Sequence, residues 1–304
     1  MIARLLSAPL LIAVFAIAMG SGIDAMVKAI APDAGLHHLL AWRFLFGGLI
    51  ALAVFRAQKR PAPSLEAIRF HTMRGLLQLG CAFTFFFALM HLPLAVATII
   101  GFTAALMVPF VARVLLGERL TPVALIATVI GFAGAALAVM GRPQNGEASE
   151  LWGLGVASCF LAAFLYALGL ILLRMRATKE DATTIAMFTN VVPAIALLPV
   201  TFGLFGVPDW NDIPLFLMFG VLGFVTWYLM TLAYARAPAQ RLAPLEYTAL
   251  IWSGIFGSVF FAEYPGWQTW VGAVIIIGAC LIVAFEERFS TRVETGLPVS
   301  DLPE

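Results

Sequence analysis

The chain alternates between long apolar runs and short polar stretches. Its apolar runs fall at 9–30, 36–55, 73–91, 94–116, 122–140, 151–173, 183–203, 213–235, 243–262 and 267–285. A helix needs about 20 residues to cross a hydrocarbon core about 30 Å thick, and each run is close to that length. The runs are continuously apolar and lack the alternating pattern of lipid-facing strands, which excludes a membrane β-barrel. The pattern therefore predicts an all-α membrane protein with ten transmembrane helices.

The composition agrees with a lipid bilayer as the surrounding solvent. Hydrophobic residues make up 62% of the 304 residues and charged residues only 12%, whereas soluble domains carry about 25% charged residues. A net charge of +1 leaves no basic face for nucleic acid. The three cysteines lie inside apolar runs, without the spacing of a disulfide framework or a metal site.

The chain contains an internal repeat. Residues 88–141 return in distorted form 145 positions later, each copy having an apolar run, a terminal glutamate, a nearby proline and a second run. Five helices per copy is an odd number, so the second copy enters the membrane from the opposite side. This predicts two inverted five-helix repeats, 1–145 and 146–286, followed by a cytoplasmic, disordered tail, 287–304. The aligned pairs are Pro93 with Pro238, Thr103 with Thr248, and Glu118 with Glu263.

Basic residues predict the orientation. Fifteen of the 18 Lys and Arg residues fall on one side of the ten spans, Lys28 and Arg142 fall on the other, and Arg43 lies within a span, where it has the option of snorkelling to the interface. Because cytoplasmic loops are rich in Lys and Arg, both termini are predicted to be cytoplasmic. The first run resembles a cleavable signal peptide, but its removal would invert this pattern.

Three features carry a family resemblance: the sequence L-G-E-R-L-T-P at 116–122, its echo at Glu263, and the helix from Leu161 through Tyr166 to Arg174. They resemble the EamA-like, ten-helix branch of the drug/metabolite transporter superfamily, and within it the chain is most similar to bacterial aromatic amino-acid exporters. The resemblance implies a bacterial inner-membrane protein with a central cavity lined by helices 1, 3, 4, 6, 8 and 9. The second copy departs from the pattern at 264–266, so its glutamate need not be held identically.

Motifs of soluble enzymes, such as H-E-x-x-H, the P-loop and G-x-S-x-G, do not occur in the sequence. We therefore predict no catalytic activity, cofactor or metal, and a secondary transporter that exports amino acids, including aromatic ones, by alternating access. Alternatives within the class are exporters of purines, cationic compounds or other metabolites and drugs. Alternatives outside it are an intramembrane enzyme and a lipid flippase. Whether the protein is a monomer or a homodimer stays open.

Polar residues at membrane depth are the first site candidates, because they usually face the bundle interior. Asp24 and Lys28 lie four residues apart on one face of the first helix. Two interpretations remain: a structural pair that satisfies itself, or a site for the charges of a zwitterionic amino acid or for a coupling proton. Gln78 and Thr103 are further polar candidates in helices 3 and 4.

Aromatic residues away from the span ends are the second group. Trp227 and Tyr228 in helix 8, with Tyr247 and Trp252 in helix 9, suit a planar apolar ligand, and Phe83 in helix 3 would complete such a box. Packing and lipid contact are the alternatives for these residues.

Other positions have either a mechanical or a structural interpretation. Tyr166 shares a face of helix 6 with small residues, typical of a packing seam or of a cavity wall. Pro109 aligns with Gly254, and the two are either gating bends or ordinary membrane-helix residues. Glu118 and Glu263 end helices, where an anion is disfavoured, so both are predicted to hold helices together. Thr121 before a proline is typical of a helix N-cap.

Overall fold

The computed structural model describes residues 9–59, 62–141, 149–176, 182–207, 210–234, 236 and 239–295, and all regular structure in these ranges is helical. Of the helices in the described ranges, nine are long and apolar enough to cross a membrane. The elements are α2 (Pro9–Ala34), α3 (Leu36–Ala57), α4 (Leu65–His91), α5 (Leu94–Leu116), α6 (Pro122–Met140), α7 (Trp152–Arg176), α8 (Ala182–Phe205), η1 (Trp210–Asp212), α9 (Ile213–Tyr234), α10 (Ala239–Glu246), α11 (Ala249–Phe261) and α12 (Trp267–Thr295).

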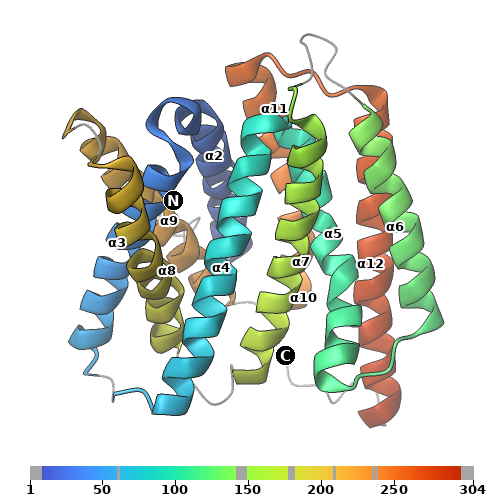
Figure 1. Cartoon of the computed structure of the whole chain (residues 1–304). Coiled ribbons are helices and arrows are strands. Elements are labelled where there is room, and N and C mark those ends of the chain that lie inside the picture. Colours follow the sequence, from blue (N-terminus) through green and yellow to red (C-terminus); the bar gives the residue numbers. More distant parts are fainter. Residues whose placement is uncertain are drawn as a thin grey trace, which may run out of the picture.

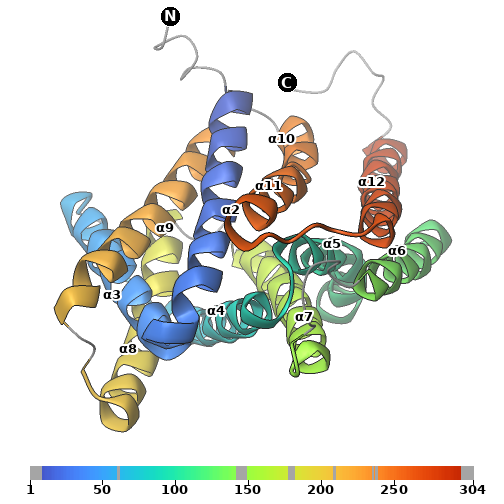
Figure 2. The ribbon, with the colours of Figure 1, turned by 90° about the horizontal axis from the view of Figure 1, so that it is seen from above.

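The helices form a central group with a pair at each flank (Figures 1 and 2). The flanking pairs are α3 with α8 and α6 with α12, and the central group holds α2, α4, α5, α7, α9 and α11. Helix α4 packs on α7 as α9 packs on α2, and α5 packs on α7 as α11 packs on α2. If each helix of one repeat is replaced by its counterpart in the other repeat, these contacts map onto one another. The bundle therefore has the predicted two-repeat architecture.

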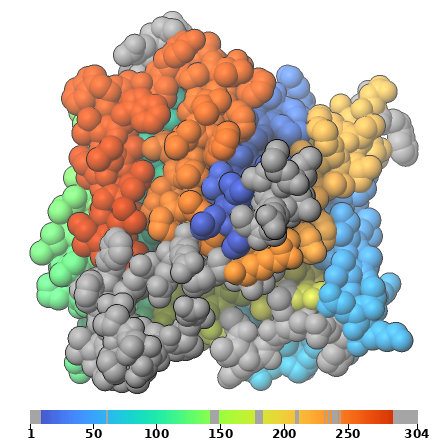
Figure 3. All heavy atoms as spheres, turned by 180° about the vertical axis from the view of Figure 1, so that it is seen from behind, coloured from blue at the N-terminus to red at the C-terminus, as the bar shows by residue number. Residues whose placement is uncertain are grey.

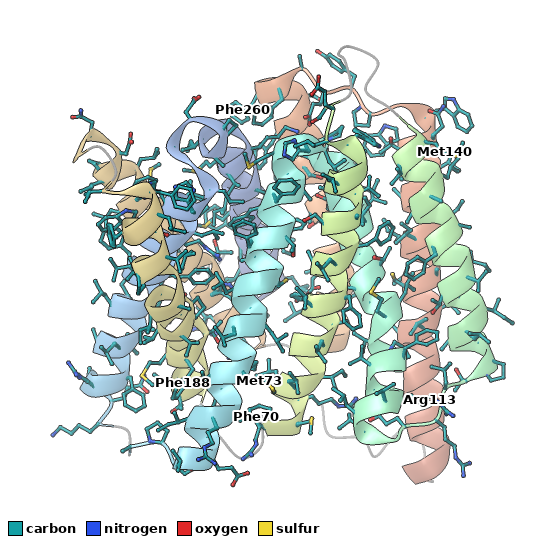
Figure 4. The ribbon with its side chains drawn as sticks, in the orientation of Figure 1. Phe70, Met73, Arg113, Met140, Phe188 and Phe260 are labelled. Atoms are coloured by element: carbon teal, nitrogen blue, oxygen red, sulfur yellow. The ribbon has the colours of Figure 1, made fainter. Side chains whose placement is uncertain are left out.

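The two repeat glutamates lie at opposite ends of the bundle. The backbone N–H of Leu94, at the start of α5, donates to Glu263 Oε2 at 2.9 Å, and α5 continues for 23 residues to the turn before Glu118. At 1.5 Å per residue this is about 35 Å. We call these the Glu263 end and the Glu118 end. In Figure 4 Phe260 marks the Glu263 end and Arg113 the Glu118 end.

Capping residues explain two helix starts. Helix α4 begins at Leu65, eight residues before the apolar run predicted, because the Ser64 side chain accepts a hydrogen bond from Ala67 N at 3.2 Å. Its first turns are too polar for hydropathy to detect. The predicted cap of α6 is confirmed, since Thr121 Oγ1 accepts from Ala124 N at 3.1 Å.

The predicted ninth helix, 243–262, differs from the structure. It consists of α10 and α11, separated by Tyr247 and Thr248. Around the break the backbone bonds span three residues instead of four, with Thr248 N donating to Leu245 O at 2.9 Å. An apolar run shows that a segment can cross the membrane but does not show that its helix is continuous.

The predicted tail also needs correction. Helix α12 extends through residue 287 to Thr295, so the first part of the segment expected to be disordered is helical. Residues 296–304 lie outside the described residues.

Glycines bring the flanking pair α6 and α12 close together. A Cβ added at Gly272 would lie 2.4 Å from the carbonyl oxygen of Gly134, so only glycine fits this contact. On the face shown in Figure 3, α11 lies between α2 and α12. Each flanking pair packs against the central group, through α3 with α9 and α8 with α4 on one flank and through α6 and α12 with α5 on the other.

Candidate functional site

Two opposite charges lie within the membrane-spanning part of the bundle. Asp24 is ten residues before the end of α2, about 15 Å from that end and near the middle of a 30 Å core. Arg43 is seven residues after the start of the adjacent α3. Both side chains are half-buried and interact electrostatically with each other. The tertiary structure thus brings Asp24 and Arg43 within electrostatic range of each other, without a direct ion pair.

Aromatic rings hold the Arg43 side chain inside the bundle. Its guanidinium carbon lies 5.1 Å from the ring centre of Phe44, 5.5 Å from Phe86 and 6.0 Å from Phe219. Aromatic faces attract a cation at such distances. Gly223 of α9 lies directly beside the Arg43 side chain, because a Cβ added there would lie 3.4 Å from Arg43 Nε. Arg43 therefore lies among rings of α3, α4 and α9 and does not extend to the interface.

Within the described ranges, neither the Asp24 carboxylate nor the Arg43 guanidinium has a hydrogen-bond or ion-pair partner. The buried Thr226 hydroxyl and Trp252 indole N–H also have none. Thr226 lies beside α2 near Asp24: a Cβ added at Gly20, one turn before Asp24, would lie 3.8 Å from Thr226 Cγ2. Leaving such groups unpaired in a protein interior is costly. A polar ligand or a water molecule bound beside them would satisfy these groups.

Lys28 binds Glu263, and so the first of the two interpretations, a structural pair with Asp24, does not hold. Its Nζ lies 2.5 Å from Glu263 Oε1 and also donates to the carbonyl oxygen of Leu92. The expected pair between Asp24 and Lys28 is therefore not formed, although the two residues share a helix face. Glu263 is 235 positions away in the sequence, so only the packing of α2 against α11 reveals this contact.

Three of the predicted aromatic residues are accessible. Tyr166 of α7 is 47% exposed, and Trp227 and Tyr228 of α9 are 59% and 58% exposed. Tyr166 interacts electrostatically with Glu246 of α10. Gln78 of α4 is half-buried. These residues remain candidates for contact with a ligand.

Phe83 lies on α4 near an apolar groove, and its place in the aromatic box stays a prediction. It is 42% exposed and lies one turn beyond Gly80, which lines an apolar groove of about 590 Å³ between α4 and α7. Met73, labelled in Figure 4, lines the same groove nearer the Glu118 end. The phenylalanine of α4 that meets α9 is Phe86, 6.3 Å from Phe219.

Thr103 and Tyr247 are engaged in packing. Thr103 is fully buried and its hydroxyl donates to Ile100 O at 2.6 Å within its own helix. The Tyr247 ring contacts Phe102 edge-on at 5.2 Å, and its hydroxyl is hydrogen-bonded with Cys280. Both residues therefore take part in packing around α5 and α12, and their place in the substrate site stays a prediction.

Neither predicted gating residue interrupts its helix. Helix α5 continues through Pro109 and α11 continues through Gly254. A Cβ at Gly254 would lie 3.5 Å from the Trp270 ring, so this glycine packs α11 against α12. The break in the second repeat is at Tyr247 and Thr248, one to two turns earlier.

A bundle of two inverted five-helix units, with opposite charges at membrane depth, is typical of multi-pass membrane transporters of small molecules. The chain matches the EamA-like transporter family over residues 6–140 and again over 153–285, one match in each repeat. It belongs to that family.

Similar proteins of known role are transporters of several substrates. An S-adenosylmethionine uptake transporter of Rickettsia prowazekii is 26% identical over 88% of this chain and 89% of its own length. A riboflavin transporter of Brucella anthropi is 26% identical over 83% and 88%. The pseudopaline exporter of Pseudomonas aeruginosa is 24% identical over 93% and 98%. These names support a transporter without enzymatic activity.

A solved crystal structure shares the fold, with a TM-score of 0.59 and 21% identity over 91% of this chain and 98% of that chain. The resemblance to the EamA-like family is confirmed by the family match in both repeats. The narrower resemblance to aromatic amino-acid exporters is not, because these relatives are named for other substrates.

Proposed function

We propose that the protein is a secondary transporter that exports amino acids, including aromatic ones, across the bacterial inner membrane by alternating access. In this proposal the Glu118 end faces the cytoplasm, as the distribution of Lys and Arg predicts. Both termini then lie on the cytoplasmic side.

The single observation that carries the proposal is the pair of unsatisfied opposite charges at membrane depth. A free amino acid is a zwitterion, so its site must offer an anion to the ammonium group and a cation to the carboxylate. Asp24 and Arg43 supply both, and neither has a hydrogen-bond partner among the described residues. Arginine binds carboxylates through two parallel N–H groups. In this proposal Arg43, and not Lys28, is the cation that binds the substrate carboxylate.

The rings around Arg43 support an aromatic or otherwise apolar side chain on the substrate. Phe44 and Phe86 are 2% and 5% exposed, and Phe219 is 1% exposed, so the apolar wall next to the charges is dry. Aromatic pairs contribute about 0.5–1.5 kcal/mol beyond the burial of area. The Rickettsia relative is named for S-adenosylmethionine, which also joins an amino-acid head to an aromatic group. Amino-acid derivatives of this kind are therefore the second candidate substrates.

Transport by purified protein in sealed vesicles tests the proposal. Labelled phenylalanine is the substrate, and its competitors are phenethylamine, which lacks the carboxylate, and phenylpropionate, which lacks the ammonium group. In the wild-type protein, we expect both analogues to compete poorly with phenylalanine. Arg43→Gln should lose the preference for phenylalanine over phenethylamine, and Asp24→Asn should lose the preference over phenylpropionate.

Arg113→Gln is the matched control, because Arg113 lies at the Glu118 end of α5, outside the charge pair. Its selectivity should equal that of wild type. Wild-type selectivity in both Asp24→Asn and Arg43→Gln would refute the proposed site. Saturable transport of S-adenosylmethionine in preference to phenylalanine would favour the second candidate substrates.

A further inference from the structure

The Glu263 carboxylate joins the two repeats at one end of the bundle. Its Oε1 lies 2.5 Å from Lys28 Nζ on α2, and its Oε2 accepts the backbone N–H of Leu94 at 2.9 Å at the start of α5. Lys28 also donates to Leu92 O in the turn between α4 and α5. Glu263 of the second repeat therefore binds two elements of the first, α2 and the start of α5, and its partner Lys28 also holds the turn between α4 and α5.

The segment that carries Glu263 is itself fixed. Glu263 N donates to Gly257 O at 3.0 Å, and Ser258 Oγ donates to Glu263 O at 3.1 Å. The space enclosed by this segment and by Pro93 and Val96 measures about 10 Å³, room for at most one water molecule. Lys28 and Glu263 are 14% and 13% exposed. The packing around the Lys28–Glu263 pair is thus tight.

An equivalent pair occurs at the opposite end. Arg174 of α7 lies 3.3 Å from Glu118, the repeat counterpart of Glu263. Glu263 follows Glu118 by 145 residues and Arg174 follows Lys28 by 146, so both partners correspond to within one position. This pair also joins one repeat to the other, because Glu118 follows α5 and Arg174 lies near the end of α7.

The two pairs differ in what surrounds them. Arg174 and Glu118 are 62% and 45% exposed, and among the described residues Arg174 is the one charged or hydrogen-bonding partner of Glu118. Exposed ion pairs contribute little to stability, whereas breaking a buried pair leaves an uncompensated charge. Leu94 has its repeat counterpart 145 positions later at Ala239, the first residue of α10.

We propose that the two pairs are alternating locks. Lys28–Glu263 holds the Glu263 end closed in the state described here, while Glu118–Arg174 is the loosened counterpart at the other end. In the opposite state Glu263 releases Leu94, and Glu118 closes the Glu118 end by binding Arg174 and the N-terminus of α10. The exchange moves each glutamate between a buried and an exposed setting. It does not depend on which substrate is carried.

Labelling of a buried cysteine beneath the closed lock measures the exchange. Val96 is fully buried and lines the small space beside Glu263. We would place Val96→Cys in full-length protein whose Cys81, Cys159 and Cys280 are replaced by serine or alanine, reconstitute it in nanodiscs, and follow its reaction with a polar maleimide. The parent should react slowly, and Glu263→Gln should react at least about fivefold faster.

Glu118→Gln is the matched control, since it weakens the opposite lock and should leave the labelling rate unchanged or lower it. Lys28→Met provides a second route to the open state and should accelerate labelling as Glu263→Gln does. The double exchange Lys28→Glu with Glu263→Lys should return the rate toward that of the parent. A monodisperse elution profile for each variant establishes that the comparison is between folded proteins.

Two outcomes overturn the proposal. One is a parental labelling rate in both Glu263→Gln and Lys28→Met. The other is acceleration by Glu118→Gln to the same extent as by Glu263→Gln, which would mean a general loosening of the bundle. Because the readout needs no substrate, it separates failure of the locks from failure of the proposed amino-acid specificity.

Discussion

Glu118 and Glu263 occupy equivalent places in the two repeats, yet the protein surrounds them differently. Glu263 is 13% exposed and binds both Lys28 and the N-terminus of α5, whereas Glu118 is 45% exposed and pairs with Arg174. In the proposed alternating locks, two copies of one motif differ in this way because a transporter in a single state is closed at one end of the bundle and open at the other. On that proposal the motif defines the contact, and the conformational state decides how far it is buried.

A second comparison concerns helix continuity. The hydroxyls of Thr103 and Thr248 each donate at 2.6 Å to the carbonyl three residues earlier. Around Thr103 helix α5 is continuous, whereas Thr248 lies at the break between α10 and α11. The same local hydrogen bond thus occurs in both settings, so the break is decided by packing beyond the turn itself.

The largest difference between the repeats should appear when each lock loses its cation. Lys28→Ala leaves the buried Glu263 unpaired, which costs about 3 kcal/mol or more, a fall of roughly 5–10 °C in apparent Tm. Arg174→Ala removes an exposed partner and should cost less than about 1 kcal/mol. Thermal unfolding in detergent provides the measurement. Equal shifts would mean that the two ends are equally closed.

Close glycine contacts should show where the repeats remain alike. A Cβ at Gly75 would lie 2.7 Å from Val192 Cβ, and one at its repeat counterpart Gly220 would lie 2.7 Å from Phe46 Cβ. Such overpacking costs about 1–3 kcal/mol. We expect Gly75→Ala and Gly220→Ala to lower apparent Tm similarly. Gly278→Ala is the control, because nothing lies within 4 Å of its Cβ position.

A smaller effect is expected at the turn after each glutamate. Thr121 caps α6 through its hydroxyl, while Gly266, 145 residues later, precedes α12 without a side chain. Thr121→Ala should cost about 1 kcal/mol in thermal unfolding, and Thr121→Ser, which keeps the oxygen, should cost clearly less. Equal losses in the two variants would assign the effect to the methyl group instead of the cap.

The membrane spans were predictable because hydropathy sums over a local window. Nine predicted helices are continuous in the structure, and errors arose where the local signal was weak. The start of α4 is polar but capped by Ser64, and the segment around Tyr247 is apolar but broken. The site was less predictable. Helical periodicity placed Asp24 and Lys28 on one face of the first helix. It does not decide which residues of other helices lie next to them.

The sequence alone determined that the chain crosses the membrane repeatedly, that it is built of two inverted copies, and that Glu118 and Glu263 are equivalent. Each of these properties follows from the composition of the chain or from the spacing of residues along it. Only the tertiary structure decided that Lys28 binds Glu263 and that Arg43 lies among aromatic rings opposite Asp24. The physical reason is that electrostatic and ring contacts act over a few ångströms in space, and the residues that make them are separated by up to 235 positions in the sequence.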